Sequence, residues 1–472
     1  MSNTLIVSAS GIRGIVGSDL TPELVTRYAA ALGHRASVRG NGRVVLGRDA
    51  RTSGEMFARA AMAGLMSVGC EVIDLGMVPT PTAQLAVEFH GAGAGLILTA
   101  SHNPVEWNAL KLVGPDGIFL DAAAVAEVGA LAEAGPERQG WNGVGLVRED
   151  RGAIERHLAA VLALPVVEPG RIREAQFRVA LDCVRGAGGA VIPDLLQRLG
   201  CEVSGIHLET DGRFPREPEP IPENLGDLRD LVQRSGAHLG MAVDPDVDRL
   251  ALVDERGNAI GEDYTLAFAV RAVLGSAAVR QAGSVAEVPS ATAAPPHRRT
   301  AVPVVVANLS TSLVVEDAAR DGGARFVRAP VGESNVAKAI VEEGALIGGE
   351  GNGGVILPAL HVGRDAPLAV ALILQYLARE GRPVSALVSA APRHRIMKAK
   401  VNRGADLLLA YAKLKARFPE ADTDQRDGLR LAWRDRWVHL RPSGTEPMIR
   451  MISEGPTEEA ALELLDACRS FL

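Results

Sequence analysis

The chain has 472 residues, of which 47% are hydrophobic and 23% charged, and its net charge is −7. This length predicts about three or four domains, and the negative charge argues against a nucleic-acid partner. No uncharged run reaches the roughly 18 apolar residues of a membrane span, and residues 1–5 do not open a signal-peptide pattern. The four cysteines are scattered without a CxxC pair, so we expect reduced thiols in a soluble, cytoplasmic protein with no membrane partner.

The first segment with a chemical signature is a glycine-punctuated loop at residues 8–14, which carries Arg13. Arginine can hold a phosphate through two parallel hydrogen bonds, so this loop can present Arg13 to an anion. A strand turn with a solvated arginine is the alternative. Thr21 and Pro22 then predict the start of a helix, because proline is favoured in the first helical turn.

A pattern of alternating strands and helices follows and recurs three times. Its copies begin with apolar strands at residues 44–46, 179–181 and 304–306. Such alternation predicts α/β units, and the spacing fits whole domains better than a solenoid repeat. In each copy a later strand leads into a polar loop, and ligands of such folds bind beyond the carboxyl ends of strands. Three related domains facing one cleft would therefore bring the three loops together.

The loop of the first copy reads Thr99-Ala100-Ser101-His102-Asn103-Pro104 and follows a short apolar run. Asn-Pro favours a turn, so Ser101 is expected to be a hydroxyl on a fixed backbone, with His102 beside it. An ordinary turn is the alternative for any few of these residues. Asn108 and Lys111 follow closely and add polar groups to the same region.

The loop of the second copy contains three aspartates spaced two residues apart, Asp244, Asp246 and Asp248. Their oxygens are the hard ligands that Mg²⁺ prefers, so this loop predicts a metal site. A solvated acidic turn is one alternative, and an EF-hand loop is another. The EF-hand is rejected because Arg249 stands where that loop needs glycine and because both flanks read as strands.

The loop of the third copy is the glycine-rich run at residues 348–354, which contains Glu350 and Asn352. It lacks the Lys-Ser/Thr pair of a P-loop, and no helix pattern follows it, so nucleotide binding is not expected. Glu350 and Asn352 have side chains suited to hydrogen bonds with neighbouring sugar hydroxyls.

After about residue 370 the pattern changes to that of a smaller α+β domain. It contains the run Arg441-Pro442-Ser443-Gly444-Thr445-Glu446-Pro447, after a predicted strand. An arginine, two hydroxyls and a glycine-freed backbone can form a nest of donors for a dianion, although a plain polar turn is the alternative. Arg450 lies on the strand that follows.

These four motifs, in this order, resemble those of the alpha-D-phosphohexomutases, which move a phosphoryl group between the 1- and 6-positions of hexose phosphates. The resemblance covers nearly the whole chain and implies an α/β protein with four domains around one central cleft. Three related α/β domains with mixed sheets are expected at residues 1–155, 156–255 and 256–370, and the α+β domain at residues 375–472. The chain departs from the family in having Ala109-Leu110 before Lys111 instead of a glycine next to the asparagine. It also has an apparent surface insertion at residues 282–302.

The resemblance implies a role for each motif. Ser101 would carry a phosphate and, with Asp244, Asp246 and Asp248, bind one Mg²⁺ per chain. Lys111 would act as general acid and base, with His102 and Arg13 supporting the phosphoryl group. A hexose 1,6-bisphosphate would be the intermediate and activator. The substrate-binding residues would be Arg249, Glu350, Asn352, Arg441, Ser443, Gly444, Thr445 and Arg450.

The sequence thus predicts an isomerase acting on a small-molecule sugar phosphate as a monomer or homodimer. The local sequence around Glu350 and Asn352 is similar to that of archaeal-type phosphoglucosamine or phosphomannose mutases. Phosphoglucosamine mutase is therefore favoured over phosphomannomutase or phosphoglucomutase. A sugar phosphatase with the same phosphoserine is a less favoured alternative. An inactive sugar-phosphate-binding protein is disfavoured because the serine, triplet and lysine are all present.

Overall fold

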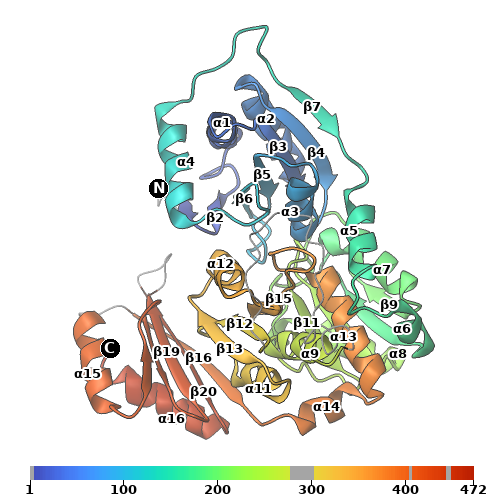
Figure 1. The fold of residues 1–472 in the computed structure, drawn as a ribbon, viewed down its shortest axis with the longest axis vertical. Coiled ribbons are helices and arrows are strands. Elements are labelled where there is room, and N and C mark those ends of the chain that lie inside the picture. The colour runs from blue at the N-terminus through green and yellow to red at the C-terminus, as the bar shows by residue number, and fades with distance from the viewer. Residues whose placement is uncertain (1–4, 277–301, 403–406, 443–447) are drawn as a thin grey trace.

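The computed structural model describes residues 5–276, 302–402, 407–442 and 448–472 (Figure 1). In these residues the strands form four sheets, one in each of four successive parts of the chain. We call these parts unit I (β1–β7), unit II (β8–β11), unit III (β12–β15) and unit IV (β16–β20). The expected insertion at residues 282–302 falls, apart from its last residue, outside the described residues.

Unit I contains a seven-stranded mixed sheet in the order β1-β2-β6-β5-β3-β4-β7. Its strands are β1 (Ile6–Ser8), β2 (Gly11–Ile15), β3 (Arg43–Arg48), β4 (Glu71–Met77), β5 (Ala94–Leu98), β6 (Trp107–Val113) and β7 (Leu146–Glu149). Its helices are α1 (Pro22–Val38), α2 (Gly54–Ser67), α3 (Thr80–Phe89) and α4 (Ala122–Ala134). Side chains alternate across a strand, so Val44 and Leu46 pack in the core with α1 and α2 while Val45 packs in the core with α3.

The first helix begins as its sequence predicts. Thr21 is the N-cap of α1, and its hydroxyl accepts a hydrogen bond from the backbone N–H of Leu24, while Pro22 occupies the first turn.

Units II and III have four strands each and share one topology, β11-β10-β8-β9 and β15-β14-β12-β13. In both, two pairings are parallel and one edge pairing is antiparallel. The strands are β8 (Arg178–Asp182), β9 (Glu202–Ile206), β10 (Leu239–Val243), β11 (Leu250–Asp254), β12 (Val304–Asn308), β13 (Arg325–Ala329), β14 (Ile347–Glu350) and β15 (Gly354–Ile356). The accompanying helices are α5 (Ala153–Leu162), α6 (Pro169–Glu174), α7 (Ile192–Arg198), α8 (Gly226–Ser235), α9 (Asp263–Leu274), α11 (Leu313–Asp321), α12 (Glu333–Glu343) and α13 (Ala366–Glu380), with short 3-10 helices at Ala187–Ala190 and Pro222–Asn224.

The threefold repeat is confirmed at the level of hairpins. The strands β6-β5-β3-β4 of unit I have the same order as the sheets of units II and III. The three predicted loops join equivalent antiparallel pairs, β5–β6, β10–β11 and β14–β15. The strands on both sides of the aspartate triplet also confirm that it does not belong to an EF-hand. Glu350 differs from its expected loop position, because it is the last residue of β14 and pairs with Gly354.

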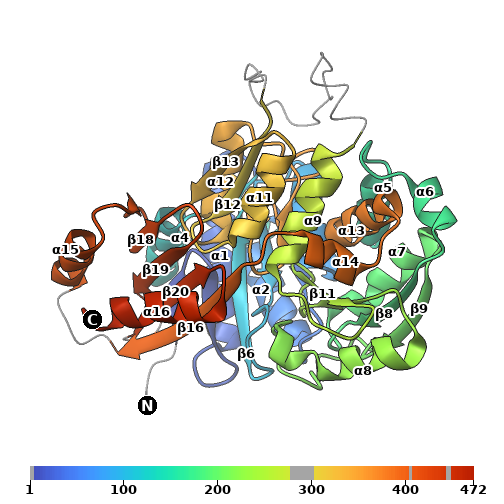
Figure 2. The same cartoon turned by 90° about the horizontal axis from the view of Figure 1, so that it is seen from below.

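One hydrophobic core joins units II and III. Leu181 and Met241 from the sheet of unit II, and Val305 and Ile347 from the sheet of unit III, belong to the same buried cluster. Helices α9 and α13 lie between the two sheets and complete this core (Figure 2). The expected domain boundary at residues 370–375 falls inside α13, whose buried apolar residues belong to the shared core. The expected boundary at residue 155 falls inside α5.

Unit IV is an antiparallel five-stranded sheet in the order β16-β20-β19-β18-β17. Its elements are β16 (Arg395–Asn402), α15 (Leu407–Arg417), β17 (Asp422–Asp424), β18 (Leu429–Ala432), β19 (Trp437–Pro442), β20 (Met448–Gly455) and α16 (Glu458–Arg469). Helix α14 (Val384–Ala390) precedes this unit and packs in the core shared by units II and III. Helices α15 and α16 enclose a separate core on the sheet (Figure 1). None of the helices in the described parts of the chain combines the length and apolar character needed to cross a membrane.

Candidate active site

Ser101 lies in the β5–β6 loop and is buried. Its hydroxyl donates to Oδ2 of Asp244 at 3.0 Å, and its backbone N–H donates to the Thr99 hydroxyl at 2.9 Å. Its φ of 49° places it in the left-handed region of the backbone. Units I and II therefore meet at the Ser101 hydroxyl.

The buried guanidinium of Arg51 holds this loop in place. It donates to four backbone carbonyls at 2.6–2.8 Å, those of Ser101, Asn103, Pro104 and Trp107. Its Nε also pairs with Asp49, which in turn accepts from the Thr99 hydroxyl at 2.6 Å. Sequence reasoning missed Arg51, and the one available signal was its position just beyond the carboxyl end of β3.

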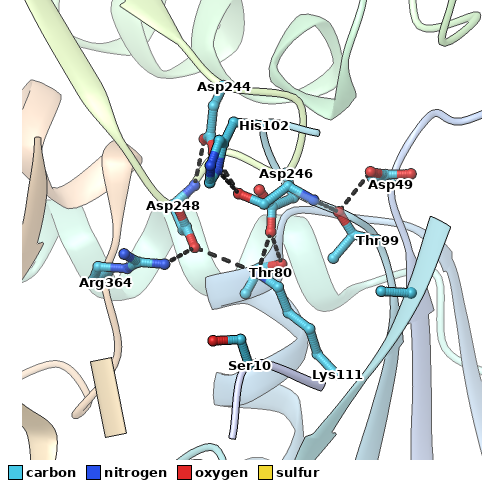
Figure 3. Close-up of polar contacts among 12 residues, drawn as sticks. Ser10, Asp49, Thr80, Thr99, His102, Lys111, Asp244, Asp246, Asp248 and Arg364 are labelled. Carbon is cyan, nitrogen blue, oxygen red and sulfur yellow. Dashed lines mark hydrogen bonds and ion pairs between the residues drawn. The ribbon is translucent and has the colours of Figure 1, made fainter. Parts of the chain in front are cut away.

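The β10–β11 loop gathers the three aspartates into a compact buried group. One ligand oxygen from each of Asp244, Asp246 and Asp248 lies within 4.8 Å of the others. Asp244 is held by the backbone N–H groups of Asp248 and Arg249, each at 3.2 Å from its Oδ1. The other two aspartates each have one oxygen engaged, since Asp246 Oδ2 accepts from Thr80 and Lys111, and Asp248 Oδ2 accepts from Arg364 (Figure 3).

The remaining oxygens of the triplet fit a cation. Within the described parts of the chain, no hydrogen-bond donor reaches the buried Oδ1 atoms of Asp246 and Asp248. Burial and the carboxylates of Asp248 and Asp246 raise the pKa of Asp244 well above its usual value. Three buried carboxylates thus lie together, and hard oxygen ligands of this kind suit Mg²⁺. The triplet can hold a cation with one oxygen from each aspartate.

Lys111 reaches the triplet from β6. Its Nζ lies 2.7 Å from Asp246 Oδ2 and 3.5 Å from Asp248 Oδ2 (Figure 3). Burial alone would lower the pKa of Lys111, but the two carboxylates outweigh burial and hold this pKa above its usual value. Lys111 is thus a protonated donor beside the cation site.

His102, Arg13 and Arg249 supply the basic groups around the serine loop. His102 Nδ1 lies 3.4 Å from Ser101 Oγ, and its pKa is held well below the usual value by burial and by the guanidiniums of Arg249 and Arg13. Arg13 donates to the Asn103 side chain at 2.8 Å. Arg249 pairs with Glu219 at 3.3 Å, and its Nε lies 3.6 Å from Asp248 Oδ1. This region therefore favours an anion on Ser101.

Arg364, immediately before the N-cap of α13, connects the triplet with unit III. Its guanidinium lies 2.7 Å from Asp248 Oδ2, 2.8 Å from Glu350 Oε2 and 3.0 Å from Glu333 Oε2. Sequence reasoning missed it, because these partners lie between 14 and 116 residues away along the chain. Thr80, which donates to Asp246 at 2.7 Å from the start of α3, was missed for the same reason.

Glu350 and Asn352 lie beside Arg364. Glu350 Oε1 accepts from the Asn308 side chain at 2.8 Å and from the Gly332 N–H at 3.0 Å, and Glu350 Oε2 accepts from Arg364. Asn352 is half-buried, and its Nδ2 lies 3.5 Å from Glu350 Oε2. The hairpin of unit III thus adds a carboxylate and an amide to the group formed by Ser101, Lys111 and the triplet.

Arg441 and Arg450 belong to unit IV, where they face each other across β19 and β20. Arg441 Nε donates to Asp427 at 2.8 Å, and Asp427 accepts from the backbone N–H of Val331 in unit III at 3.1 Å. Arg450 is exposed. The structure therefore ties Arg441 to unit III and does not bring either arginine into the contacts around Ser101. Ser443, Gly444 and Thr445 lie outside the described residues.

Fold and site together define a four-unit α/β protein built around a buried serine hydroxyl and a carboxylate cation site. Family models described as phosphoglucomutase/phosphomannomutase match in order: alpha/beta/alpha domain I at residues 4–139, domain II at 155–257, domain III at 290–394 and the C-terminal domain at 396–470. The chain belongs to the phosphoglucomutase/phosphomannomutase family.

Named relatives agree with this family. The chain is 38% identical to a probable phosphoglucosamine mutase of Methanopyrus kandleri, over 97% of this chain and 95% of the relative. It is 36% identical to a phosphoglucomutase/phosphomannomutase of Thermococcus kodakarensis, over 97% and 96% of the two chains. Among solved structures, a phosphoglucomutase/phosphomannomutase family protein from Burkholderia thailandensis superimposes with a TM-score of 0.84 at 26% identity, covering 100% of this chain and 97% of that chain.

Proposed function

We propose that the protein is a phosphohexomutase that interconverts hexose 6-phosphates and 1-phosphates through a phosphoserine at Ser101. The observation that carries this proposal is the contact of the Ser101 hydroxyl with Asp244, beside two buried triplet oxygens that have no donor. A phosphate on Ser101 brings about −1.5 to −2 charges. It would lie between the basic groups of Arg13, His102 and Arg249 and a cation held by the triplet.

Mg²⁺ bound by Asp244, Asp246, Asp248 and the Ser101 phosphate would offset the repulsion between phosphate and carboxylates and stabilise charge on the transferring phosphoryl group. In the first half-reaction the bond between phosphorus and Ser101 Oγ breaks as a bond to the substrate hydroxyl forms. Lys111, kept protonated by Asp246 and Asp248, gives a proton to the departing Ser101 Oγ. The resulting amine accepts the proton of the attacking hydroxyl, so the protons balance within one transfer.

The product of this step is a hexose 1,6-bisphosphate. This sugar reverses its orientation in the site and returns a phosphoryl group to Ser101 from its other phosphate. Added hexose 1,6-bisphosphate would therefore act as an activator. Glu350 and Asn352 orient the sugar hydroxyls, and Arg441 with Ser443, Gly444, Thr445 and Arg450 holds the phosphate that does not react. Glucosamine phosphate is the favoured sugar, supported by the relatives named probable phosphoglucosamine mutase, with mannose and glucose phosphates as alternatives.

Side-by-side turnover of glucosamine, mannose and glucose phosphates, with and without EDTA, tests this function. We expect isomerisation, fastest with glucosamine phosphate, that stops in EDTA and returns with Mg²⁺. Calcium should restore it poorly, because its larger and looser coordination misplaces the phosphoryl oxygen. Release of inorganic phosphate faster than isomerisation would instead indicate a sugar phosphatase.

A cytoplasmic location is part of the proposal. It is supported by the four cysteines, Cys70, Cys183, Cys201 and Cys468, which are all free thiols in the structure. The expected quaternary state, monomer or homodimer, stays a prediction.

A further inference from the structure

Arg364 contacts more carboxylates of the site than any single charge can neutralise. Its guanidinium lies within 3.0 Å of Asp248, Glu350 and Glu333, which come from the β10–β11 loop, the end of β14 and the start of α12. Only 7% of the residue is exposed. A planar guanidinium has five N–H donors in a rigid fork, so it can serve several carboxylates at fixed angles, whereas a lysine ammonium acts as a single point charge.

The first consequence concerns Asp248. Arg364 occupies Oδ2 of this carboxylate, and Oδ1 is the buried oxygen left without a donor. The guanidinium therefore holds Oδ2 of Asp248 and leaves Oδ1, 3.6 Å from Arg249 Nε, as the oxygen that a cation can use. Residues that hold the ligands of a metal in this way commonly determine how well the metal binds.

The second consequence concerns Glu350. Arg364 occupies Oε2 of Glu350, while Asn308 and Gly332 occupy Oε1, so the carboxylate beside Asn352 has a fixed orientation. The Arg364 side chain thus fixes the orientation of one carboxylate in the triplet and of one carboxylate in the hairpin of unit III.

Packing fixes Arg364 itself. The backbone N–H of Arg364 donates to Glu333 Oε1 at 3.1 Å. Two residues later, the backbone N–H of Ala366 donates to the carbonyl of Val247, inside the triplet loop, at 3.2 Å. A Cβ on Gly354 would lie 2.2 Å from Arg364 Cδ, so the backbone of the hairpin lies directly against the arginine. This contact requires glycine at position 354.

We propose that Arg364 is a positioning residue that couples the cation site to the sugar-binding hairpin. Because the same guanidinium orients Asp248 and Glu350, a change that moves Arg364 alters both sites, whereas the loss of the Asn352 side chain, which leaves Arg364 in place, alters only sugar binding. The coupling follows from the contacts of Arg364, and only the identity of the sugar phosphate rests on the proposed function.

The test compares Arg364→Lys, Asn352→Ala and the wild-type protein. Calorimetric titration with Mg²⁺ alone gives the metal Kd, and steady-state assays with glucosamine phosphate give KM and kcat. We expect Arg364→Lys to raise both the Mg²⁺ Kd and the KM about 10-fold, because charge is kept and the fork is lost. Asn352→Ala should raise KM and leave the Mg²⁺ Kd within about twofold. A wild-type Mg²⁺ Kd or a wild-type KM in Arg364→Lys would overturn the coupling.

Gly354→Ala provides a second variant, in which Arg364 is still present but its side chain is pushed out of position by the added methyl group. It should also raise both constants, and a change in KM alone would overturn the proposal. Arg35→Met, at a buried arginine that pairs with Glu127 on the far side of unit I, is the matched control and should change neither constant. Melting temperatures show that each variant folds. A wild-type protein that binds Mg²⁺ but turns over no sugar phosphate would refute the proposed function, while the Mg²⁺ titrations of Arg364→Lys and Gly354→Ala would still decide the effect on the cation site.

Discussion

Two residues at the centre of the site hold an uncommon backbone conformation. Ser101 has a φ of 49°, and Val247, between two aspartates of the triplet, has a φ of 63°. A residue other than glycine pays about 1–3 kcal/mol for such a conformation and keeps it only where its surroundings enforce it. Arg51 and Thr99 enforce it at Ser101, and the Ala366 N–H binds the carbonyl of Val247. The strain turns Ser101 Oγ towards Asp244.

The Ser101→Ala variant tests the residue at which phosphate is carried. We expect intact-mass analysis of active wild-type protein to show one phosphate on the peptide containing Ser101. The variant should carry none and should lose mutase activity by orders of magnitude, because among the described residues Ser101 supplies the hydroxyl that donates to Asp244. Its circular dichroism should match the wild type, and near-normal turnover in this variant would contradict the assignment.

Arg51→Met tests the support beneath the loop. Both Arg51 and Asp49 have fully buried side chains, so the variant leaves a buried carboxylate without its partner. Breaking a buried pair in this way costs about 3–5 kcal/mol, and unit I should melt at a lower temperature in calorimetry. The double variant Asp49→Asn, Arg51→Met should recover part of that stability but not the activity, since four carbonyls of the Ser101 loop still lack their donor. Equal melting of the single variant and the wild type would show that Arg51 contributes little.

At the scale of elements, the hairpins were predictable from sequence and the contacts between them were not. Ser101 and the triplet follow short apolar strands and Glu350 ends one, and this local pattern is enough to place all of them at the carboxyl ends of strands. Arg51, Thr80 and Arg364 have ordinary local contexts. Their partners come from other elements, and only the packing of the three units selects those contacts.

The strands of unit IV show a related limit. The sequence predicted strand, helix, strand and helix after residue 392, whereas the residues described there form five strands and two helices. Strand β17 (Asp-Thr-Asp) carries no apolar residue, and β18 (Leu-Arg-Leu-Ala) is only four residues long, so neither gives a periodic pattern long enough to mark a strand.

The first turns of α9 and α11 give a pH-dependent prediction. Asp263, the first residue of α9, accepts from the Ser312 N–H at 2.8 Å, and burial, with Glu454 and Glu262 nearby, raises the pKa of Asp263 to about 8. An unfolded aspartate has a pKa of about 3.9. The folded state thus binds this proton more tightly, and the stability that the proton contributes is complete below pH 4 and lost as the pH rises to 8.

Asp263→Asn removes this titration. From pH 4 to pH 8 the wild-type protein should lose at least about 1 kcal/mol relative to the variant, the free energy of roughly one pKa unit. Urea unfolding at a series of pH values measures the difference. Parallel stability curves for the two proteins would show that Asp263 is ionised throughout this range.

At the scale of the whole molecule, unit IV is joined to unit III mainly by polar contacts. Glu454 accepts from the Ser312 hydroxyl and from the Leu313 N–H, His439 contacts Ser310 at 2.8 Å, and Asp427 links Arg441 to Val331. The core of unit IV is a separate cluster. Arg441 is therefore held to unit III through one carboxylate.

Arg441→Ala distinguishes a phosphate clamp from a residue of the transfer step. A clamp binds ground state and transition state alike, so its loss appears mainly in KM. We expect KM to rise about 10-fold or more, for a charge-assisted bond of about 1.5–3 kcal/mol, with a smaller fall in kcat. Asp427→Asn, which keeps Arg441 and weakens its tether, is the control and should raise KM less. A collapsed kcat at unchanged KM would assign Arg441 to the chemistry.

The core shared by units II and III has a mechanical consequence. Residues from Leu158 to Leu387 pack in one cluster, while units I and IV have cores of their own. The aspartate triplet and the β14–β15 hairpin consequently belong to two sheets that share one core, so their separation is set when the chain folds. A sugar that reverses its direction between two phosphoryl transfers would therefore turn between parts of the chain that hydrogen bonds connect, Ser101 to Asp244 on one side and Asp427 to Val331 on the other.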